Sequence, residues 1–403
     1  MPVEALVTPE VMRWARETRG FDIEQAAKKI GRSAEEICGW EDGSQRPSMP
    51  QARKAAEAYK RPLAVFYLPE PPKGYEVLKD FRRLPNEYDR HFSPDLLMLI
   101  REASSRQEWL RDFLQNEGSG PLGFIGCART SADSIAVAES IRAAIGLTHE
   151  DQQKSRTRED ALNLWIEHVE AAGIFISRDS KVSCEEARGF ALCDAYAPLI
   201  FINSKDAKSA QVFTLAHELA HLWIDVSGVS NLEHRGQWQI PQADSVEAFC
   251  NGVAGQLVLP RDSFSQMWSV LPKSTAIEER IESVAAKCKV SSEVVARRLL
   301  ESQVISEEKY HELRDLYKAR WLEYRDAESQ ARKEREDTPP LYYPLTAMRN
   351  GQTFTRLVLG AYFTGMISGR EASSLLSVKV DKFGKLAHQV KVYTRASQGG
   401  SRS

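Results

Sequence analysis

The chain has 403 residues, with 54 Lys+Arg and 56 Asp+Glu, which gives a formal net charge of -2 at pH 7. Because domains typically hold about 100–200 residues, this length predicts two to four domains. The 42% hydrophobic and 27% charged residues are ordinary for a globular protein and argue against wholesale disorder. The balanced charge argues against a protein whose main task is to coat nucleic acid or an anionic membrane, although it is compatible with one small DNA-reading module.

The lack of a visible secretory signal or membrane span and the usage of cysteine predict a cytoplasmic protein with no membrane partner. The first thirty residues contain no apolar stretch typical of a secretory signal, and the apolar run Leu63–Leu68 is far shorter than a membrane span. Six scattered cysteines form no C-x-x-C pair. This usage is typical of reduced, mostly buried thiols.

The first domain, residues 1–72, is expected to be all-helical. Residues 8–61 predict four or five short helices, and the segment PLAVFYLPEPPKG marks the end of the domain. A helical connector follows over 73–129. The predicted helix boundaries in the first domain are the N-caps Thr8 and Asp22 and the helix-ending glycines Gly20, Gly31 and Gly43.

From residue 159 the pattern predicts an α+β domain, assigned to 130–303. The β-branched run GIFISRD and the segment RGFALCDAYAPLIFIN predict three strands. An irregular stretch reaching Gln242 separates two apolar helices. The predicted helices are Ala161 to Ala172, Ala207 to Ile224, Ser245 to Leu259, and further helices near 275–302.

The remaining residues, 304–403, are expected to form a C-terminal helical region and tail. Residues 306–336 predict a charged amphipathic helix, which is either a solvated brace or the contact of a homodimer. TPPLYYP reads as a linker, and 345–390 predict a small α/β tail.

The segment FTLAHELAHLWI contains the chemistry-bearing motif. His217 and His221 stand at i and i+4, so both imidazoles lie on one helix face and can share one Zn²⁺. Glu218 lies beside the first of them, where a carboxylate can take a proton from water; this is the H-E-x-x-H pattern of metallopeptidases. The alternative is an accidental surface cluster, but the apolar neighbours argue against an exposed helix.

A catalytic zinc needs a third protein ligand, and the candidates are His234, Asp244 and Glu247. Glu247 is favoured because it lies on the next apolar helix, although Asp244 and Glu247 also match a helix capping box. Asn251, one turn after Glu247, favours the ligand reading because a polar side chain among apolar ones needs a partner, such as a metal ligand. His234 is a candidate oxyanion stabiliser, and the alternative is a solvated loop histidine.

The mechanism predicted from these residues is zinc-assisted peptide hydrolysis. Zinc acidifies water and polarises the scissile carbonyl, and Glu218 is the general base that later passes the proton to the leaving amine. The strand RGFALCD or its neighbour is a candidate to pair with an extended substrate backbone.

FTLAHELAHLWI, the preceding PLIFIN and the following VEAFCNGVAGQLVLP resemble the ImmA/IrrE family of metallopeptidases over residues 130–303. The resemblance implies a zincin-like α+β fold with a gluzincin-type site, in which His217, His221 and Glu247 bind zinc and Glu218 is the base. It also implies cleavage of a partner protein, a transcription repressor, in a stress-response or mobile-element switch.

The N-terminus resembles an XRE-type helix-turn-helix, with Ile23, Ala27, Gly31 and Ile37 at the motif's structural places and WEDGSQRP after them. Residues 1–72 hold 11 Lys+Arg and 11 Asp+Glu, so their charges sum to zero. The expected reading helix opens with Ala34, Glu35 and Glu36 and has none of the residues that commonly read base edges, so a protein-docking or dimerisation role stands beside DNA binding as an equal hypothesis. The candidate DNA contacts are Arg32, Ser33, Gln45 and Arg46.

The main hypothesis is a cytoplasmic zinc endopeptidase that cleaves a protein partner, with the helix-turn-helix for targeting. One alternative is a DNA-binding regulator, or a component of a toxin–antitoxin or phage-defence system, whose peptidase domain mainly senses. A second alternative is an interaction protein in which zinc is only structural.

Overall fold

The computed structural model describes residues 4–72, 93–230, 243–334 and 341–392. The chain divides into two compact units, the first unit (Met1–Ser105) and the second unit (Arg106–Ser403). The division falls inside helix α6 (Pro94–Asn116). Each unit is described by itself.

The first unit contains a bundle of short helices, as the sequence predicts. The bundle consists of α1 (Pro9–Thr18), α2 (Ile23–Ile30), α3 (Ala34–Asp42), α4 (Met49–Tyr59) and the 3-10 helix η1 (Leu63–Tyr67). Asp22 caps α2 by accepting a hydrogen bond from the Gln25 amide, and Gly31 ends α2 in the left-handed conformation. Thr8 is the N-cap residue of α1 as predicted, but its side chain makes no hydrogen bond to the helix and its hydroxyl donates to the Leu68 carbonyl instead.

A buried ion pair holds α1 to α3. Arg16 Nε and Nη2 donate to the two carboxylate oxygens of Glu41 at 2.7 and 2.8 Å, and Arg16 Nη1 donates to the Phe21 carbonyl. Both side chains are almost wholly covered. Two parallel hydrogen bonds between a guanidinium and a carboxylate fix the angle between the two helices.

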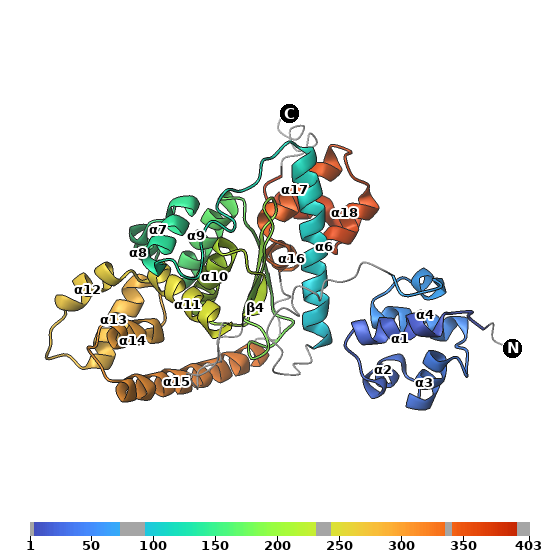
Figure 1. The fold of residues 1–403 in the computed structure, drawn as a ribbon, viewed down its shortest axis with the longest axis horizontal. Coiled ribbons are helices and arrows are strands. Elements are labelled where there is room, and N and C mark those ends of the chain that lie inside the picture. Colours follow the sequence, from blue (N-terminus) through green and yellow to red (C-terminus); the bar gives the residue numbers. More distant parts are fainter. Residues whose placement is uncertain (1–3, 73–92, 231–242, 335–340, 393–403) are drawn as a thin grey trace. The chain divides into compact units, whose positions relative to one another are not determined.

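The second unit surrounds a four-stranded sheet with helices (Figure 1). Its strands are β1 (Phe175–Asp179), β2 (Gly189–Leu192), β3 (Leu199–Asn203) and β4 (Gly228–Ser230). The helices between residues 130 and 260 are α7 (Ser134–Ile145), α8 (His149–Lys154), α9 (Arg158–Ala171), α10 (Lys208–Trp223) and α11 (Ala243–Val258). The later ones are α12 (Arg261–Ser269), α13 (Ile277–Cys288), α14 (Ser292–Glu301), α15 (Glu307–Glu334), α16 (Tyr342–Asn350), α17 (Gln352–Phe363), α18 (Gly369–Leu376), η2 (Val380–Lys382) and α19 (Phe383–Gln389).

The strand order is β1-β3-β2-β4, with β1 parallel to β3 and the other neighbours antiparallel. The strand β2 therefore has a partner on each side, and β4 is the outer strand next to it. The expectation that the strand RGFALCD itself pairs with a substrate is thus wrong for β2, whose two edges are both taken. Its neighbour β4, which the sequence reading missed within the irregular stretch, is the strand at that edge.

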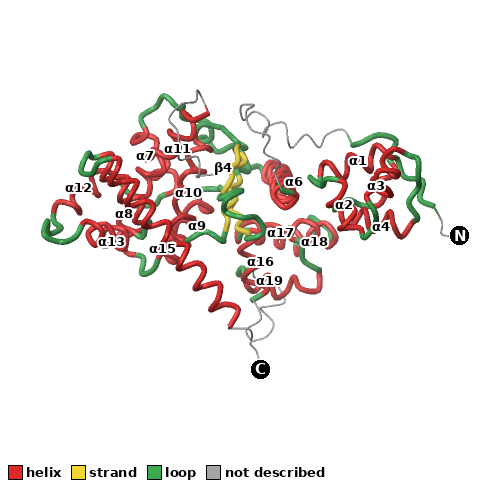
Figure 2. Tube along the Cα trace, turned by 90° about the horizontal axis from the view of Figure 1, so that it is seen from below, coloured by secondary structure: helices red, strands yellow, loops and turns green. Residues whose placement is uncertain are grey.

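Helices cover both faces of the sheet, with α9, α10 and α11 on one side and α16 and α17 on the other (Figures 1 and 2). The face toward α10 carries Ile176, Ile200 and Ile202, which join the main hydrophobic core. On β2 this face carries only Gly189 and Ala191, because alternate residues of a strand point the same way. These small residues leave room for the large side chains of α10.

Two expectations from the sequence are corrected. The regular elements of 345–390 are all helices, so this stretch is not an α/β tail. The thiols are not mostly buried, since only Cys250 and Cys288 are buried while Cys38 and Cys127 are exposed. None of the helices in the described ranges combines the length and apolar composition needed to cross a membrane.

Candidate metal centre

Helix α10 presents His217 and His221 on one face, as the i, i+4 spacing predicts. The helix is buried along nearly its whole length, and the two histidines are 0% and 2% exposed. The Nε2 atoms of the two rings face each other at 3.1 Å. If both Nε2 atoms were unprotonated, their lone pairs would repel each other at this distance. A proton or a cation must therefore lie between them.

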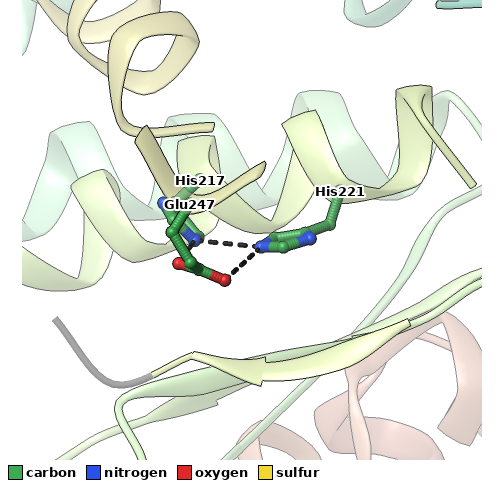
Figure 3. Close-up of side chains that lie close together, drawn as sticks. All are labelled: His217, His221 and Glu247. Carbon is green, nitrogen blue, oxygen red and sulfur yellow. Dashed lines mark hydrogen bonds and ion pairs between the residues drawn. The ribbon is translucent and has the colours of Figure 1, made fainter. Parts of the chain in front are cut away.

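Helix α11 packs against α10 and brings Glu247 to the same point (Figure 3). One carboxylate oxygen lies 3.2 Å from His217 Nε2, and the other lies 3.4 Å from His221 Nε2. Glu247 is also the most exposed of the three, with 42% of its side chain accessible. The group is therefore closed by protein on the helix side and open toward solvent at the carboxylate.

The three residues fit a zinc ion. With zinc–nitrogen and zinc–oxygen bonds of about 2.0–2.1 Å, neighbouring ligands of a tetrahedral ion lie about 3.3 Å apart. The observed separations of 3.1, 3.2 and 3.4 Å are close to this value. Two imidazoles and one carboxylate are also a donor set of catalytic zinc sites, which keep a fourth position open. Among the described residues, this is the group of three His, Cys, Asp or Glu side chains whose ligand atoms all lie within 4.8 Å of one another.

The charges within the group also favour a cation. Burial by itself raises the pKa of the Glu247 carboxyl, but hydrogen bonds and charges from His217 and His221 outweigh burial and hold that pKa well below its usual range. Burial by itself lowers the pKa of His221, yet hydrogen bonds with Cys250 and Glu247 raise it well above the ordinary value. Without metal, the site therefore holds a carboxylate and a proton on the imidazoles, and a metal cation supplies the positive charge in place of that proton.

Two further side chains of α11 face the histidines. Asn251 Oδ1 accepts a hydrogen bond from His217 Nδ1 at 3.1 Å, which leaves the Nε2 lone pair of His217 directed at the metal position. Cys250, fully buried, lies against the His221 ring. The sequence reading missed Cys250, although its place one turn after Glu247 is a signal that could have found it.

Glu218 is fully buried between α10 and β2. A Cβ atom at Gly189 would lie 3.1 Å from Glu218 Oε1, 2.5 Å from Thr214 Cγ2 and 2.9 Å from the Phe201 carbonyl. Only glycine fits at this point of β2, and the glycine leaves the space that the Glu218 carboxylate fills. The negative charge of Glu218 is one of the causes that raise the pKa of His221, so the two side chains are electrostatically coupled.

Two sequence candidates lie beyond what the structure describes. His234 lies outside the described residues, and the side chain of Asp244 is also not described, although Asp244 belongs to α11. The structure thus brings Glu247 to the histidines and leaves the other two candidates without a described position.

The candidate DNA contacts of the first unit lie on its surface beside acidic groups. Arg32 is 3.8 Å from Glu36 and Arg46 is 3.9 Å from Glu4. Ser33 is the N-cap of α3, and its hydroxyl accepts from the Glu36 amide. The Gln45 side chain packs on Gly39 of the same helix.

The class of this site follows from a family comparison. Residues 170–300, which span β1 to α14 and include α10 and α11, match the Peptidase_M78 family model. That model is described as the IrrE N-terminal-like domain, so the match supports the resemblance to the ImmA/IrrE family for this part of the chain and implies a metallopeptidase-type domain. A search of the curated proteins found no match to the chain.

Proposed function

We propose that this protein is a zinc-dependent endopeptidase that cleaves a partner protein. One observation carries the proposal: His217, His221 and Glu247 converge with the spacing of a zinc ligand set. A merely structural zinc would have a closed set of four protein ligands, whereas the described residues supply three with an exposed side, which is typical of a catalytic ion.

The residues of the chain divide the chemistry among themselves. When bound, zinc supplies a Lewis acid that polarises the scissile carbonyl and acidifies the attacking water. Glu218 takes the proton of that water and passes it to the leaving amine. Asn251 holds His217 in the tautomer and orientation that binding requires. His234 is retained as the proposed oxyanion stabiliser.

The outer strand β4 supports an extended peptide as the substrate. It is the last strand on the side of β2 in the part of the sheet that the structure describes, and an edge strand can add a further backbone by hydrogen bonding. Gly189 of β2 lies against Glu218 of α10. A peptide that pairs with β4, the neighbour of β2, would therefore run along the edge of the sheet that is nearer to Glu218. On the family resemblance we infer that the partner is a transcription repressor in a stress-response, mobile-element or defence switch.

The first unit is proposed as a helix-turn-helix that targets the enzyme to its partner. The alternative is a DNA-binding regulator, or a toxin–antitoxin or phage-defence component, in which the peptidase domain mainly senses. The alternative has less support because Arg32 and Arg46 each lie beside a glutamate and α3 presents acidic side chains to solvent.

The test compares protein termini in cells that express the parent chain or its Glu218→Gln variant. The variant keeps all three ligands, so purified protein is expected to retain zinc while cleavage falls by about 10²–10⁴-fold. Glu308→Gln, an identical change on the exposed surface of α15, is the matched control and should cleave like the parent.

Each outcome separates the hypotheses. New termini that depend on Glu218 support the endopeptidase, whereas unchanged cleavage by a zinc-loaded Glu218→Gln protein would contradict the assigned base. If the parent produces no new termini in cells that contain its partner, the sensing regulator becomes the better reading.

A further inference from the structure

A second group of metal-binding side chains lies outside the site formed by α10 and α11. It consists of His149 at the start of α8, Met267 in α12 and Cys288 at the end of α13. The Cys288 sulfur lies 3.6 Å from Met267 Sδ and 3.9 Å from His149 Nε2. The Cys288 thiol thus lies next to both an imidazole and a thioether from residues far away in the sequence.

We propose that His149, Met267 and Cys288 form a binding site for one Cu(I) ion. Thiolate and thioether sulfurs are soft ligands that select Cu(I), and imidazole also suits copper. With metal–sulfur bonds of about 2.3 Å and metal–nitrogen bonds of about 2.0–2.1 Å, ligands 110–120° apart give sulfur–sulfur separations of about 3.8–4.0 Å and sulfur–nitrogen separations of about 3.6–3.8 Å. The measured separations of 3.6 Å between the two sulfurs and 3.9 Å between the Cys288 sulfur and His149 Nε2 are close to these ranges, so the side chains need only small movements to accept the ion.

The surroundings of Cys288 are fixed by a buried hydrogen-bond network. Gln152 is fully buried, and its amide nitrogen donates to the carbonyls of Cys288 at 2.6 Å and Val258 at 3.1 Å. Trp165 Nε1 in turn donates to the Gln152 side-chain oxygen at 3.1 Å. This network positions the end of α13 against α8, and such support around ligands is common in metal sites.

The site has both a dry interior and an entry path. Cys288 is completely buried, while His149 and Met267 are partly exposed, so an ion can reach the thiol along the other two side chains. Burial, with a smaller effect of the nearby Arg142 charge, lowers the pKa of His149 to about 4, which keeps the imidazole in its neutral, metal-binding form.

Charge balance favours a monovalent ion over zinc. On binding, the Cys288 thiol releases its proton to solvent and a copper–sulfur bond forms, with no change in oxidation state. Cu(I) with one thiolate, a neutral imidazole and a thioether carries no net charge, which a site beside Arg142 and flanked by Lys287 and Lys289 tolerates. A divalent ion with the same ligands would leave a net positive charge there.

The experiment is an anaerobic titration of the zinc-loaded full chain with Cu(I) against the competing chelator bicinchoninate. Exposed thiols also bind copper, so the titration uses a Cys38→Ser, Cys127→Ser background. We expect one tightly held ion per chain, whose X-ray absorption spectrum shows two sulfur neighbours and one nitrogen neighbour. Met267→Leu, which keeps the side-chain volume, should lower the affinity by at least about 10–100-fold.

Matched variants decide the result. Met366→Leu removes an exposed methionine elsewhere and should leave the affinity unchanged. His149→Gln should weaken binding like Met267→Leu, which keeps the proposal testable even if Cys288→Ala fails to fold. If Met267→Leu and His149→Gln both bind Cu(I) as tightly as the background protein, the proposal is wrong and Cys288 is a buried thiol that only donates a hydrogen bond to Met267 Sδ.

Discussion

Helix α10 and helix α3 each contain a short sequence motif, but the side chains that would carry out the function are buried on α10 and exposed on α3. On α10 the motif residues His217 and His221 point inward and are buried. On α3 the buried residues are Ile37, Gly39, Trp40 and Glu41, while the residues that would meet a ligand are exposed. A polar group that is buried needs a partner, so an inward-facing motif indicates chemistry directly.

For α3, by contrast, the motif indicates only how the helices pack. The buried side chains of Ala27 and Ile37 explain the close approach of α2 and α3, and Gly31 ends α2 in the left-handed conformation. These residues say nothing about what the outer surface binds. That surface carries Glu35 and Glu36 at the start of the helix. A motif made of buried apolar residues therefore predicts how helices pack, and the exposed side chains have to be judged separately for what they bind.

The largest effect is expected from the buried ion pair of the first unit, and its removal tests whether the two units are independently stable. Glu41→Gln removes the charge that neutralises buried Arg16 and should reduce the free energy of unfolding of the first unit by about 3–5 kcal/mol. Urea unfolding followed by fluorescence, which Trp14 and Trp40 report for this unit, measures the change. Zinc bound to the second unit should stay the same.

The control for this prediction is Glu17→Gln. Glu17 is the other acidic partner of Arg16, at 3.5 Å, but its side chain is 59% exposed. An exposed pair is worth at most about 1 kcal/mol, so the control should unfold nearly like the parent. Equal effects of both variants would show that burial of Glu41 is not the source of its contribution.

A smaller effect is expected from the orientation of a ligand in the second unit. Asn251→Ala removes the acceptor of the His217 Nδ1 hydrogen bond and should lower zinc affinity by about 10–100-fold, as measured by competition with a chelator. Asn251→Asp keeps an acceptor oxygen and should retain most of the affinity. If Asn251→Ala binds zinc like the parent, Asn251 does not orient His217.

Much of the helix pattern was predictable because local signals agree with burial. Asp22, Gly31 and Gly43 mark helix boundaries in the structure as the sequence predicts. The i, i+4 spacing of His217 and His221 is a property of any α-helix. Glu247 could be put forward only by weighing alternatives, because its approach to the histidines depends on how α11 crosses α10, which sequence spacing does not encode.

The remaining errors share a physical cause, since tertiary contacts override local pattern. The strand β4 has three residues and exists through its pairing with β2, so no local signal marks it. The C-terminal stretch contains valines that are common in strands, yet Val378 and Val390 are buried where α18 and α19 end. In such positions a hydrophobic residue closes a helix end.

Acid should weaken the second unit through His149. Its pKa is lowered to about 4 by burial, with a smaller effect of Arg142, whereas the unfolded chain has the ordinary value of about 6.5. The unfolded state therefore binds more protons between these values, and stability present above pH 6.5 is lost as the pH falls toward 4, with about 2 kcal/mol of it lost by pH 5. His149→Gln should remove this loss.

The measurement is the free energy of unfolding of the parent and His149→Gln proteins at pH 7.5 and pH 5. Zinc ligands also take up protons in acid, so the difference between the two proteins at each pH isolates His149. Residues 4–72 contain no histidine, and the described part of the first unit supplies an internal reference. A difference that does not change with pH would contradict the shifted pKa.

The smallest effect concerns the outer surface of α3. Glu36→Gln removes one negative charge beside Arg32, and a glutamine oxygen can still accept the Ser33 amide hydrogen bond of the capping box. We expect the parent to bind promoter and random DNA equally weakly at physiological salt, and the variant to bind both about 2–5-fold more tightly, because one more cation becomes available to phosphates. Fluorescence anisotropy at two salt concentrations measures both quantities. A parent protein that prefers a promoter over random DNA would show that exposed residues of α3 read sequence despite their acidity. The helices α3 and α10 would then both carry functional side chains, and they would differ only in whether those side chains are exposed or buried.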